Sequence, residues 1–249
     1  MVTTLGVVEV RRIADVPFPT ACRRLGGKSL LEWVVRRMQD SLRLDRVVVL
    51  CPYVPQAQEL ADIVPRDVPL LIIDKPDALA RFSAALEQQP AEAMVCVAAE
   101  HPFVDPELID RLITTAANHP EADYIGFCSR SGRPAMTSPL GMIGEWIRAT
   151  ALHDANLEAR DPHPRSHVAG FLRAHPERYQ LRLTPVPQEL DRDDLRLIIT
   201  GEEDWENVQA IFEALGPEQL DYQHIACLLD HQPALRERMA TLNRFVGAT

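Results

Sequence analysis

The first 128 residues alternate between short apolar runs and segments with helical periodicity. Strand-like runs, rich in Val, Ile and Leu, occur at residues 5–10, 46–51, 68–73, 94–98 and 124–128. The segments between them repeat apolar residues at the spacing of amphipathic helices, at residues 29–38, 56–63, 77–86 and 105–113. Strands that alternate with helices form parallel β-α-β units in a sheet covered on both faces. The alternation predicts an α/β fold.

Two of the predicted helices carry complete start signals. In Ser29-Leu30-Leu31-Glu32 the serine can accept a backbone hydrogen bond while the glutamate reaches back, which is the spacing of a capping box. Asp105-Pro106-Glu107 combines a capping residue, the preferred proline position and an acid at the positive end of the helix dipole. We therefore expect helices to begin directly after Ser29 and Asp105.

The pattern changes after residue 128. Residues 129–139 are polar and loop-like, residues 145–160 have helical spacing, and residues 167–174 resemble a strand or a mixed segment. An acidic, proline-containing loop at 185–194 leads into a predicted strand at 195–200. These residues interrupt the alternation, as an insertion would.

The end of the chain is predicted to be helical, over residues 203–215 and again over the last thirty residues, ending near Phe245. No repeat, low-complexity tract or Gly/Ser linker divides the sequence. We therefore expect a single domain over residues 1–249, with an inserted arm at about 129–190.

The charge balance excludes some partners. Asp and Glu number 36 against 26 Lys and Arg, which gives a net charge of −10 without any basic run. Nucleic acids and anionic membranes are bound by clustered cations, and apolar runs such as Met94–Ala99 are far shorter than the ~20 residues of a membrane span. The five cysteines form no CxxC pair. The run at residues 5–10 lacks the charged, apolar and cleavage regions of a signal peptide, so we do not expect it to be one. We expect a cytoplasmic protein with neither nucleic acid nor membrane as partner.

Candidate functional residues follow the predicted strands. In open parallel sheets, ligands bind beyond the carboxyl ends of the strands. Residues 11–28 follow the first strand, Glu100 and His101 follow the fourth, and residues 200–204 follow the last. We expect a binding site where these three segments meet.

Seven segments also match, in order, the motifs of one known family. They are Gly6-Val7-Val8 with Arg11, residues 25–32, residues 45–49, Asp77-Ala78-Leu79-Ala80-Arg81-Phe82, residues 102–109, Arg165-Ser166-His167-Val168, and Arg196-Leu197 with Glu202-Glu203-Asp204. Together they resemble the cytidylyltransferases that activate acidic and related sugars. The spore-coat-polysaccharide type, related to the acylneuraminate and octulosonate cytidylyltransferases, is the most similar.

This resemblance implies a Rossmann-like nucleotide-diphospho-sugar transferase fold, with a mostly parallel sheet, helices on both faces and a dimerisation-type arm. It implies transfer of CMP from CTP to a sugar hydroxyl, which gives a CMP-sugar and pyrophosphate, with Mg²⁺ as cofactor. The implied partners are CTP or a nucleotide sugar, a small sugar substrate, and a second copy of the chain in a homodimer.

The triphosphate loop departs from the family. An ungapped alignment places Ile13, Val16 and Thr20 where the family carries a Gly, an Arg and a Lys, while Arg11 is retained. The loss of the Arg and the Lys removes two charge-assisted contacts, each worth roughly 1.5–3 kcal/mol. Only two of the 26 basic residues are Lys, so the sequence favours Arg over Lys. That bias does not explain Val16 and Thr20, because replacing Lys by Arg would have kept the positive charge at each position. Lys28 follows two glycines. The resemblance implies that this Gly-Gly-Lys segment forms a structural turn rather than a phosphate contact.

The metal-binding carboxylates differ as well. Glu100 stands where the family has an Asp after the central strand, and its longer side chain would displace an octahedral Mg²⁺. Thr200 replaces the second metal-binding Asp, and Asp204 could substitute only if its loop rearranged. Alternatively, residues 202–204 are an acidic cluster at a helix N-terminus.

The remaining candidates carry open alternatives. Arg11 contacts phosphate, or it caps the first strand in a surface ion pair; Glu100 binds metal, or it is a solvated acid. The resemblance implies that Arg81 lines the base or sugar pocket and that Arg165 and His167 face the sugar.

Two functions therefore remain open. The first is a cytidylyltransferase of surface-polysaccharide or acidic-sugar biosynthesis that uses Arg11, Glu100 and Asp204. The second is a catalytically inactive relative that binds a sugar, a nucleotide sugar or a partner enzyme. The apolar residues of the loop at 13–19 favour the second, because a phosphate cradle would be polar.

Overall fold

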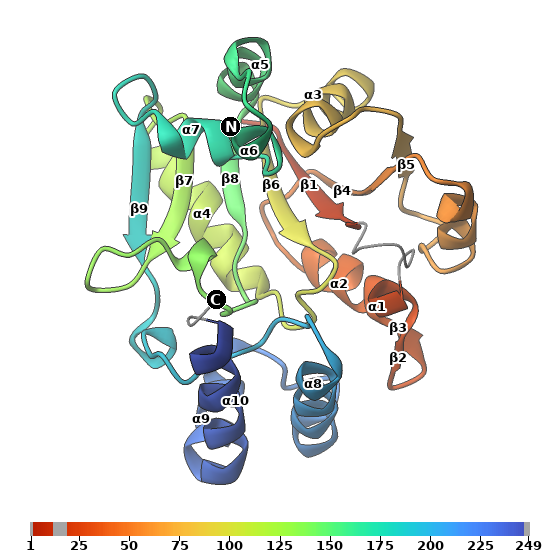
Figure 1. The fold of residues 1–249 in the computed structure, drawn as a ribbon, viewed down its shortest axis with the longest axis vertical. Coiled ribbons are helices and arrows are strands. Elements are labelled where there is room, and N and C mark those ends of the chain that lie inside the picture. The colour runs from red at the N-terminus through yellow and green to blue at the C-terminus, as the bar shows by residue number, and fades with distance from the viewer. Residues whose placement is uncertain (1, 12–18, 247–249) are drawn as a thin grey trace.

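The computed structural model describes residues 2–11 and 19–246, and a seven-stranded sheet runs through its centre (Figure 1). The strands of this sheet are β1 (Thr4–Glu9), β4 (Arg46–Pro52), β5 (Leu70–Ile73), β6 (Ala93–Ala98), β7 (Tyr124–Cys128), β8 (Glu145–Arg148) and β9 (Leu181–Pro185). They lie in the order β5-β4-β1-β6-β8-β7-β9. Only β8 is antiparallel to its neighbours β6 and β7 in this sheet, and the other pairs are parallel. The predicted α/β class with a mostly parallel sheet is confirmed.

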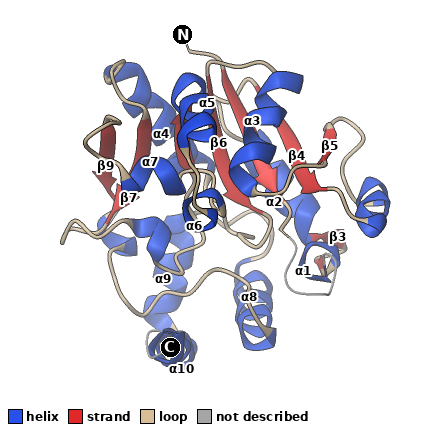
Figure 2. Cartoon of the chain, turned by 45° about the horizontal axis from the view of Figure 1, so that its top comes forward, coloured by secondary structure: helices blue, strands red, loops and turns tan. Residues whose placement is uncertain are grey.

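Helices cover both faces of the sheet (Figure 2). One face packs against α2 (Leu30–Gln39) and α4 (Pro106–Asn118), and the other against α3 (Ala78–Gln88), α5 (Ala149–Glu158) and α7 (Gly170–Ala174). The strands divide their side chains between two apolar cores. In β4, for example, Val47, Val49 and Cys51 enter one core while Val48 and Leu50 enter the other. Burial on both faces explains why the strands read as continuous apolar runs.

The predicted helix starts after Ser29 and Asp105 are confirmed. The Ser29 hydroxyl accepts a hydrogen bond from the Glu32 amide at 3.1 Å. The Asp105 carboxylate accepts from the amides of Glu107 and Leu108, so that α4 begins at Pro106. These local bonds satisfy amides that the first helical turn leaves unpaired.

Two sequence predictions are wrong, those for residues 145–160 and 195–200, and of the two alternatives for residues 167–174 the strand does not form. Residues 145–160 begin with strand β8 before α5, because Trp146 and Ile147 pair with both β6 and β7. Residues 167–174 contain the helix α7 rather than a strand. Residues 195–200 are not a strand in the described structure: Leu197 and Ile199 each donate one backbone hydrogen bond, to Pro139 and Glu100. The helix predicted at residues 56–63 forms as a 3₁₀ helix, η1 (Pro55–Asp62).

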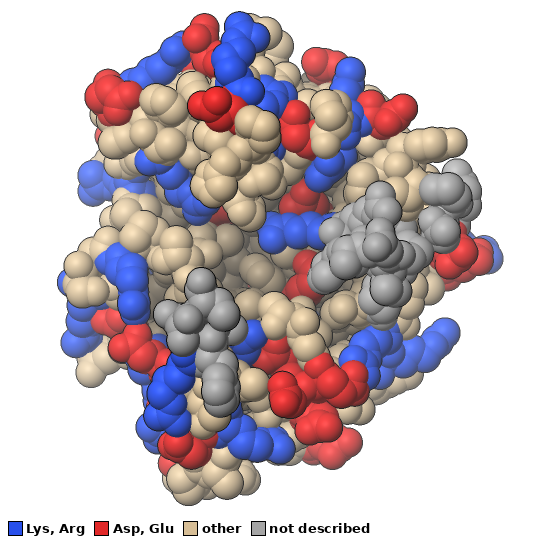
Figure 3. All heavy atoms as spheres, in the orientation of Figure 1, with Lys and Arg blue, Asp and Glu red and all other residues tan. Residues whose placement is uncertain are grey.

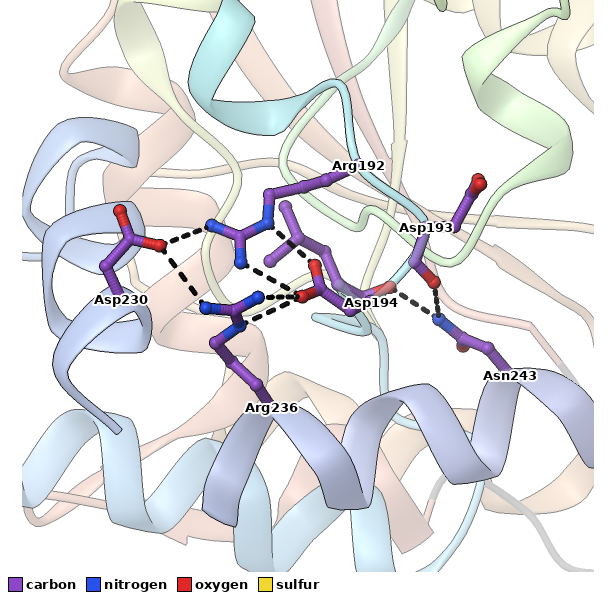
Figure 4. A network of polar contacts seen from close by, with 7 residues as sticks. Arg192, Asp193, Asp194, Asp230, Arg236 and Asn243 are labelled. Atoms are coloured by element: carbon purple, nitrogen blue, oxygen red, sulfur yellow. Dashed lines mark hydrogen bonds and ion pairs between the residues drawn. The ribbon is translucent and has the colours of Figure 1, made fainter. Parts of the chain in front are cut away.

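Three helices follow the sheet and lie together at one end of it (Figure 1). They are α8 (Glu202–Leu215), α9 (Tyr222–His231) and α10 (Pro233–Val246), so the chain is helical near Phe245 as predicted. Figure 4 shows how the preceding loop is tied to them. The carboxylate of Asp194 accepts hydrogen bonds from Arg192 and from Arg236 of α10, and Arg192 also bonds Asp230 of α9.

The segment 129–190 contributes both β8 and β9 to the central sheet, so this part of it is integrated rather than separate. It also holds the short helices η2 (Ala135–Thr137), α6 (Pro162–Arg165) and η3 (Gln188–Leu190). Its role in dimerisation stays a prediction. No helix within the described residues is long and apolar enough to cross a membrane.

Candidate functional site

Charged side chains meet where β1 and β6 end. Glu9 is the last residue of β1 and pairs with Ala98, the last residue of β6, while Glu100 follows two positions later. Because β8 runs in the opposite direction, its first residue, Glu145, lies near the same edge, beside Cys96. Figure 3 shows a hollow near the centre of this face, with acidic and basic side chains on its walls.

Glu9 joins two of the predicted site residues. Its carboxylate is 6% exposed and accepts from the Nε of Arg11 at 2.8 Å and from a terminal nitrogen of Arg81 at 3.4 Å. Burial lowers the pKa of Arg11, but the carboxylates around it, Glu9 first, outweigh burial and raise that pKa above its ordinary value. Arg11 therefore stays charged, and its ion pair is with a buried acid rather than a surface one.

Glu100 lies within the electrostatic reach of Arg11. Burial raises the pKa of its carboxyl to about 7, although the charge of Arg11 opposes the shift. The backbone is fixed by neighbours, since the Ile199 amide donates to the Glu100 carbonyl at 3.0 Å. The Glu100 carboxyl is therefore close to half protonated at neutral pH.

Two buried nitrogen atoms beside these acids lack partners. Across the described residues, nothing accepts a hydrogen bond from the Nε of Arg81, and Nδ1 of His101 has no partner either. Burial, assisted by the charge of Arg11, lowers the pKa of His101 to about 4, so the imidazole is neutral at physiological pH. Unpaired buried polar atoms are costly, and at this edge they mark a place where a polar ligand would be stabilised.

Sequence reasoning missed Glu9 and Glu145. The Glu145 carboxylate accepts from the Tyr124 hydroxyl at 2.6 Å and from Arg173 at 2.9 Å. Burial, reinforced by Glu145, raises the pKa of Tyr124 well above its usual value. The signal that could have found both acids is a glutamate at the end of an otherwise apolar strand, since such an acid needs a cationic partner.

The structure places Arg165 and His167 differently from each other. Arg165 donates from Nε to Asp77 at 2.7 Å and from one terminal nitrogen to the carbonyls of Asn156 and Ala159, so it joins the start of α3 to the end of α5. His167 is exposed, and burial, Arg11 and Arg173 lower its pKa. His167 thus lies nearer to the strand-end cluster, while Arg165 holds two helices. Their contact with sugar stays a prediction.

Asp204 lies in a buried ion pair with Arg196. Its carboxylate is 3% exposed and accepts from Arg196 at 2.6 Å and from both the amide and the hydroxyl of Thr200 at 2.8 Å. A metal ion would have to displace these bonds. Of the two functions suggested for residues 202–204, Asp204 is structural in this geometry, and Glu202 pairs with Arg23.

The triphosphate loop is only partly described. Ile13 and Val16 lie outside the described residues, and Thr20 lies in α1 (Pro19–Cys22). The interpretation of Gly26-Gly27-Lys28 as a structural turn is confirmed: it joins β2 (Arg24–Leu25) to β3 (Lys28–Ser29). Gly26 has a φ of 55°, and a Cβ there would lie 2.5 Å from the Phe212 ring of α8.

Mg²⁺ needs oxygen ligands, and the site offers few carboxylates that are free to bind it. Glu100 supplies a carboxylate without an ion-pair partner within 4 Å in the described chain, whereas Glu9 and Asp204 are engaged by arginines. No group of three or more His, Cys, Asp or Glu side chains could hold a metal within the parts of the chain that the structure covers. Mg²⁺ commonly uses one or two carboxylates together with substrate phosphates. The residues present fit that mode.

Comparison with known proteins places this chain in a family. Residues 19–177 match the MobA-like NTP transferase domain. A curated relative, the spore coat polysaccharide biosynthesis protein SpsF of Bacillus subtilis, is 28% identical over 165 residues, and the match spans 65% of each chain. A cytidylyltransferase from Leptospira borgpetersenii superposes with a TM-score of 0.84 at 17% identity, covering 94% of this chain and 97% of that one.

Two further solved structures were obtained with ligands. CMP:2-keto-3-deoxy-manno-octonic acid synthetase complexed with CTP has a TM-score of 0.64 at 11% identity, and 85% of this chain covers 99% of that one. Rv0371c of Mycobacterium tuberculosis H37Rv in complex with manganese has a TM-score of 0.57 at 14% identity, with 84% and 98% covered. These likenesses establish a nucleotidyltransferase fold of Rossmann type. With its matching domain, this chain belongs to the MobA-like NTP transferase family, among proteins that include cytidylyltransferases.

Proposed function

We propose that the protein transfers CMP from CTP to the hydroxyl of a small sugar, in the biosynthesis of surface polysaccharides or acidic sugars. The observation that carries the proposal is the placement of Arg11 and Glu100, each two residues after the end of its strand, beyond the paired carboxyl ends of β1 and β6. Family membership, the similarity to SpsF and the CTP complex of a structural neighbour support it.

Catalysis in such a site is mainly positioning and charge neutralisation. The sugar hydroxyl releases its proton to solvent as its oxygen forms a bond to the α-phosphorus, the bond from that phosphorus to the β-phosphate oxygen breaks, and pyrophosphate leaves. Arg11 would neutralise phosphate charge, and Glu9 would hold its guanidinium in place. Arg81, tied to the same Glu9, would line the base or sugar pocket.

Mg²⁺ is the proposed cofactor, held by Glu100 and by phosphate oxygens of the substrate. When bound it would withdraw charge from the phosphates. We also propose that the protein acts in the cytoplasm as a homodimer whose contacts come from residues 129–190, with no nucleic acid or membrane as partner.

One observation favours a second function, binding without transfer. The carboxylate of Asp204 is taken up by Arg196 and Thr200, so it does not supply a second metal ligand in this geometry. A nucleotide or nucleotide sugar could then occupy the strand-end site without being turned over. The second candidate is thus an inactive relative that binds a sugar nucleotide or regulates a partner enzyme.

Calorimetry with CTP and Mg²⁺ tests whether the nucleotide site exists at all. The proposal expects Kd values in the micromolar range, lost in Arg11→Ala and kept in Arg43→Ala, which removes an equal charge at an exposed position outside the site. Absence of binding at about millimolar CTP would contradict both candidate functions that involve a nucleotide.

A further inference from the structure

A cavity of about 460 Å³ lies between α3 and the segment that joins α5 to α6. In Figure 1 these helices gather at the end of the molecule opposite α8, α9 and α10. The residues that line it are Lys75, Ala80, Ser83, Ala84, Glu87, Asn156, Ala159, Arg160 and Arg165. Arg11, Arg81 and Glu100 do not line it, so it is distinct from the strand-end site.

The cavity exists because small side chains face each other across the helix contact. Ala80, Ser83 and Ala84 present one wall from α3, and Ala159 presents the other just after the end of α5. These short side chains leave space that larger residues would fill. A volume of this size lies within the range of small-molecule pockets.

Cations dominate the polar part of the lining. Lys75 and Arg160 are exposed, and neither has a carboxylate within 4.0 Å among the residues described. Arg165 adds a third positive charge, although its guanidinium is bonded to Asp77 and to backbone carbonyls. Glu87 is the single acid of the lining. The chain has a net charge of −10. The lining of this cavity nevertheless carries three cations and one acid, so its local charge is positive.

The neutral polar group of the lining also offers donors. The side-chain oxygen of Asn156 accepts from Arg165 at 2.8 Å. Its NH₂ group is therefore the part of the amide that remains for a ligand, and NH₂ only donates. Donors beside unpaired cations suit an anion with several acceptor oxygens, since lysine acts as a point charge and arginine as a two-pronged donor.

We propose that this cavity binds a phosphate ester of a small molecule. The phosphate would lie between Lys75 and Arg160, and the organic part would pack against the alanines of the two walls. The volume is too small for a folded partner and larger than a free phosphate needs. The proposal does not depend on the proposed function, because CTP would bind at the other site.

The test is calorimetry of the full chain with glucose 1-phosphate, with inorganic phosphate and with glucose. The variant is Lys75→Ala/Arg160→Ala. Its matched control is Arg43→Ala/Arg66→Ala, which removes two exposed cations elsewhere. We expect saturable binding of glucose 1-phosphate, weaker for inorganic phosphate and absent for glucose. We expect the pocket variant to bind about tenfold or more weakly and the control to bind as wild type does.

Three outcomes would overturn the proposal. They are no saturable binding of glucose 1-phosphate up to about 10 mM, an equal loss in both double variants, and a loss confined to Arg11→Ala, which would place the phosphate at the strand ends. Unchanged thermal melting of the variants ensures that a loss is not unfolding. Failure of CTP to bind would contradict the proposed function and leave this pocket's result intact.

Discussion

Glu9 organises the candidate site at the scale of single residues. Its buried carboxylate contacts Arg11 and Arg81, which come from the end of a strand and from the second turn of α3. A buried acid holding two guanidinium groups fixes the direction of each. The residues with perturbed pKa values, Glu100 and His101, lie next to this group, as is common at functional sites.

In the absence of metal, protonation of Glu100 makes the free energy of unfolding depend on pH. Its pKa is raised from 4.5 to about 7 on folding, so stability is fully present below pH 4.5 and is lost as the pH rises through 7. Glu100→Gln removes this loss. By urea unfolding without metal, we expect it to be more stable than wild type by about 2–3 kcal/mol at pH 8, with little difference at pH 4.

The exposed acid Glu218 supplies the control for that experiment. Glu218→Gln should change the free energy of unfolding by less than about 0.5 kcal/mol at either pH. Equal stability of Glu100→Gln and wild type at pH 8 would mean that Glu100 is not buried as described.

Substitution of Asp204 distinguishes a structural role of this residue from a role in metal binding. Asp204→Asn breaks a buried ion pair and should cost about 3–5 kcal/mol of unfolding free energy without any metal present. Glu202→Gln, in a far more exposed pair with Arg23, should cost no more than about 1 kcal/mol. If Asp204→Asn kept its metal-free stability and lost only CTP and Mg²⁺ binding, Asp204 would be a ligand after all.

At the scale of elements, α3 couples the core to the site. Asp77 caps it through the Ala80 amide at 2.9 Å and also accepts from Arg165, while Arg81 reaches Glu9 one turn later. The start of α3 therefore fixes how Arg81 enters the site.

A double-mutant cycle between Asp77 and Arg165 measures this link. Asp77→Ala should cost about 1–2 kcal/mol as a lost cap, plus its share of the ion pair. The two changes together should cost less than the sum of the single changes, with a coupling of about 1 kcal/mol. If urea unfolding showed that the double variant loses the sum of the two single losses, the 2.7 Å contact between Asp77 and Arg165 would contribute nothing to stability.

Elements with local signals could be predicted from the sequence, and those set by distant pairing could not. The starts of α2 and α4 depend on bonds within three residues, as at Ser29 and Asp105. β8 depends on pairing with residues 21 to 55 positions earlier in the chain, so the helical spacing of residues 145–160 was misleading. Arg11 and Glu100 were found because they follow strands, whereas the partners of Asp204 appear only after folding.

At the scale of the whole molecule, the sheet has exposed edges. β9 lies at one edge, within the segment predicted to mediate dimerisation, and Leu183 on it is 38% exposed. Edge strands present unpaired backbone groups that a second copy can cover.

Sedimentation velocity checks the predicted homodimer. We expect a mass of about twice the 27.9 kDa of the chain. Leu183→Asp should shift the protein toward monomer, while Leu42→Asp, at a residue 92% exposed outside the segment, should not. A wild-type monomer at all accessible concentrations would refute the homodimer.

Pyrophosphate release tests the central claim most directly. The protein is mixed with CTP, Mg²⁺ and a panel of acidic sugars, and pyrophosphate is measured over time. We predict release that requires all three components, falls about 100-fold or more in Arg11→Ala and is unchanged in Arg43→Ala. If CTP binds but no sugar yields pyrophosphate above the protein-free rate, transfer is excluded for that panel and the account of Arg11 and Glu100 as transfer residues is contradicted.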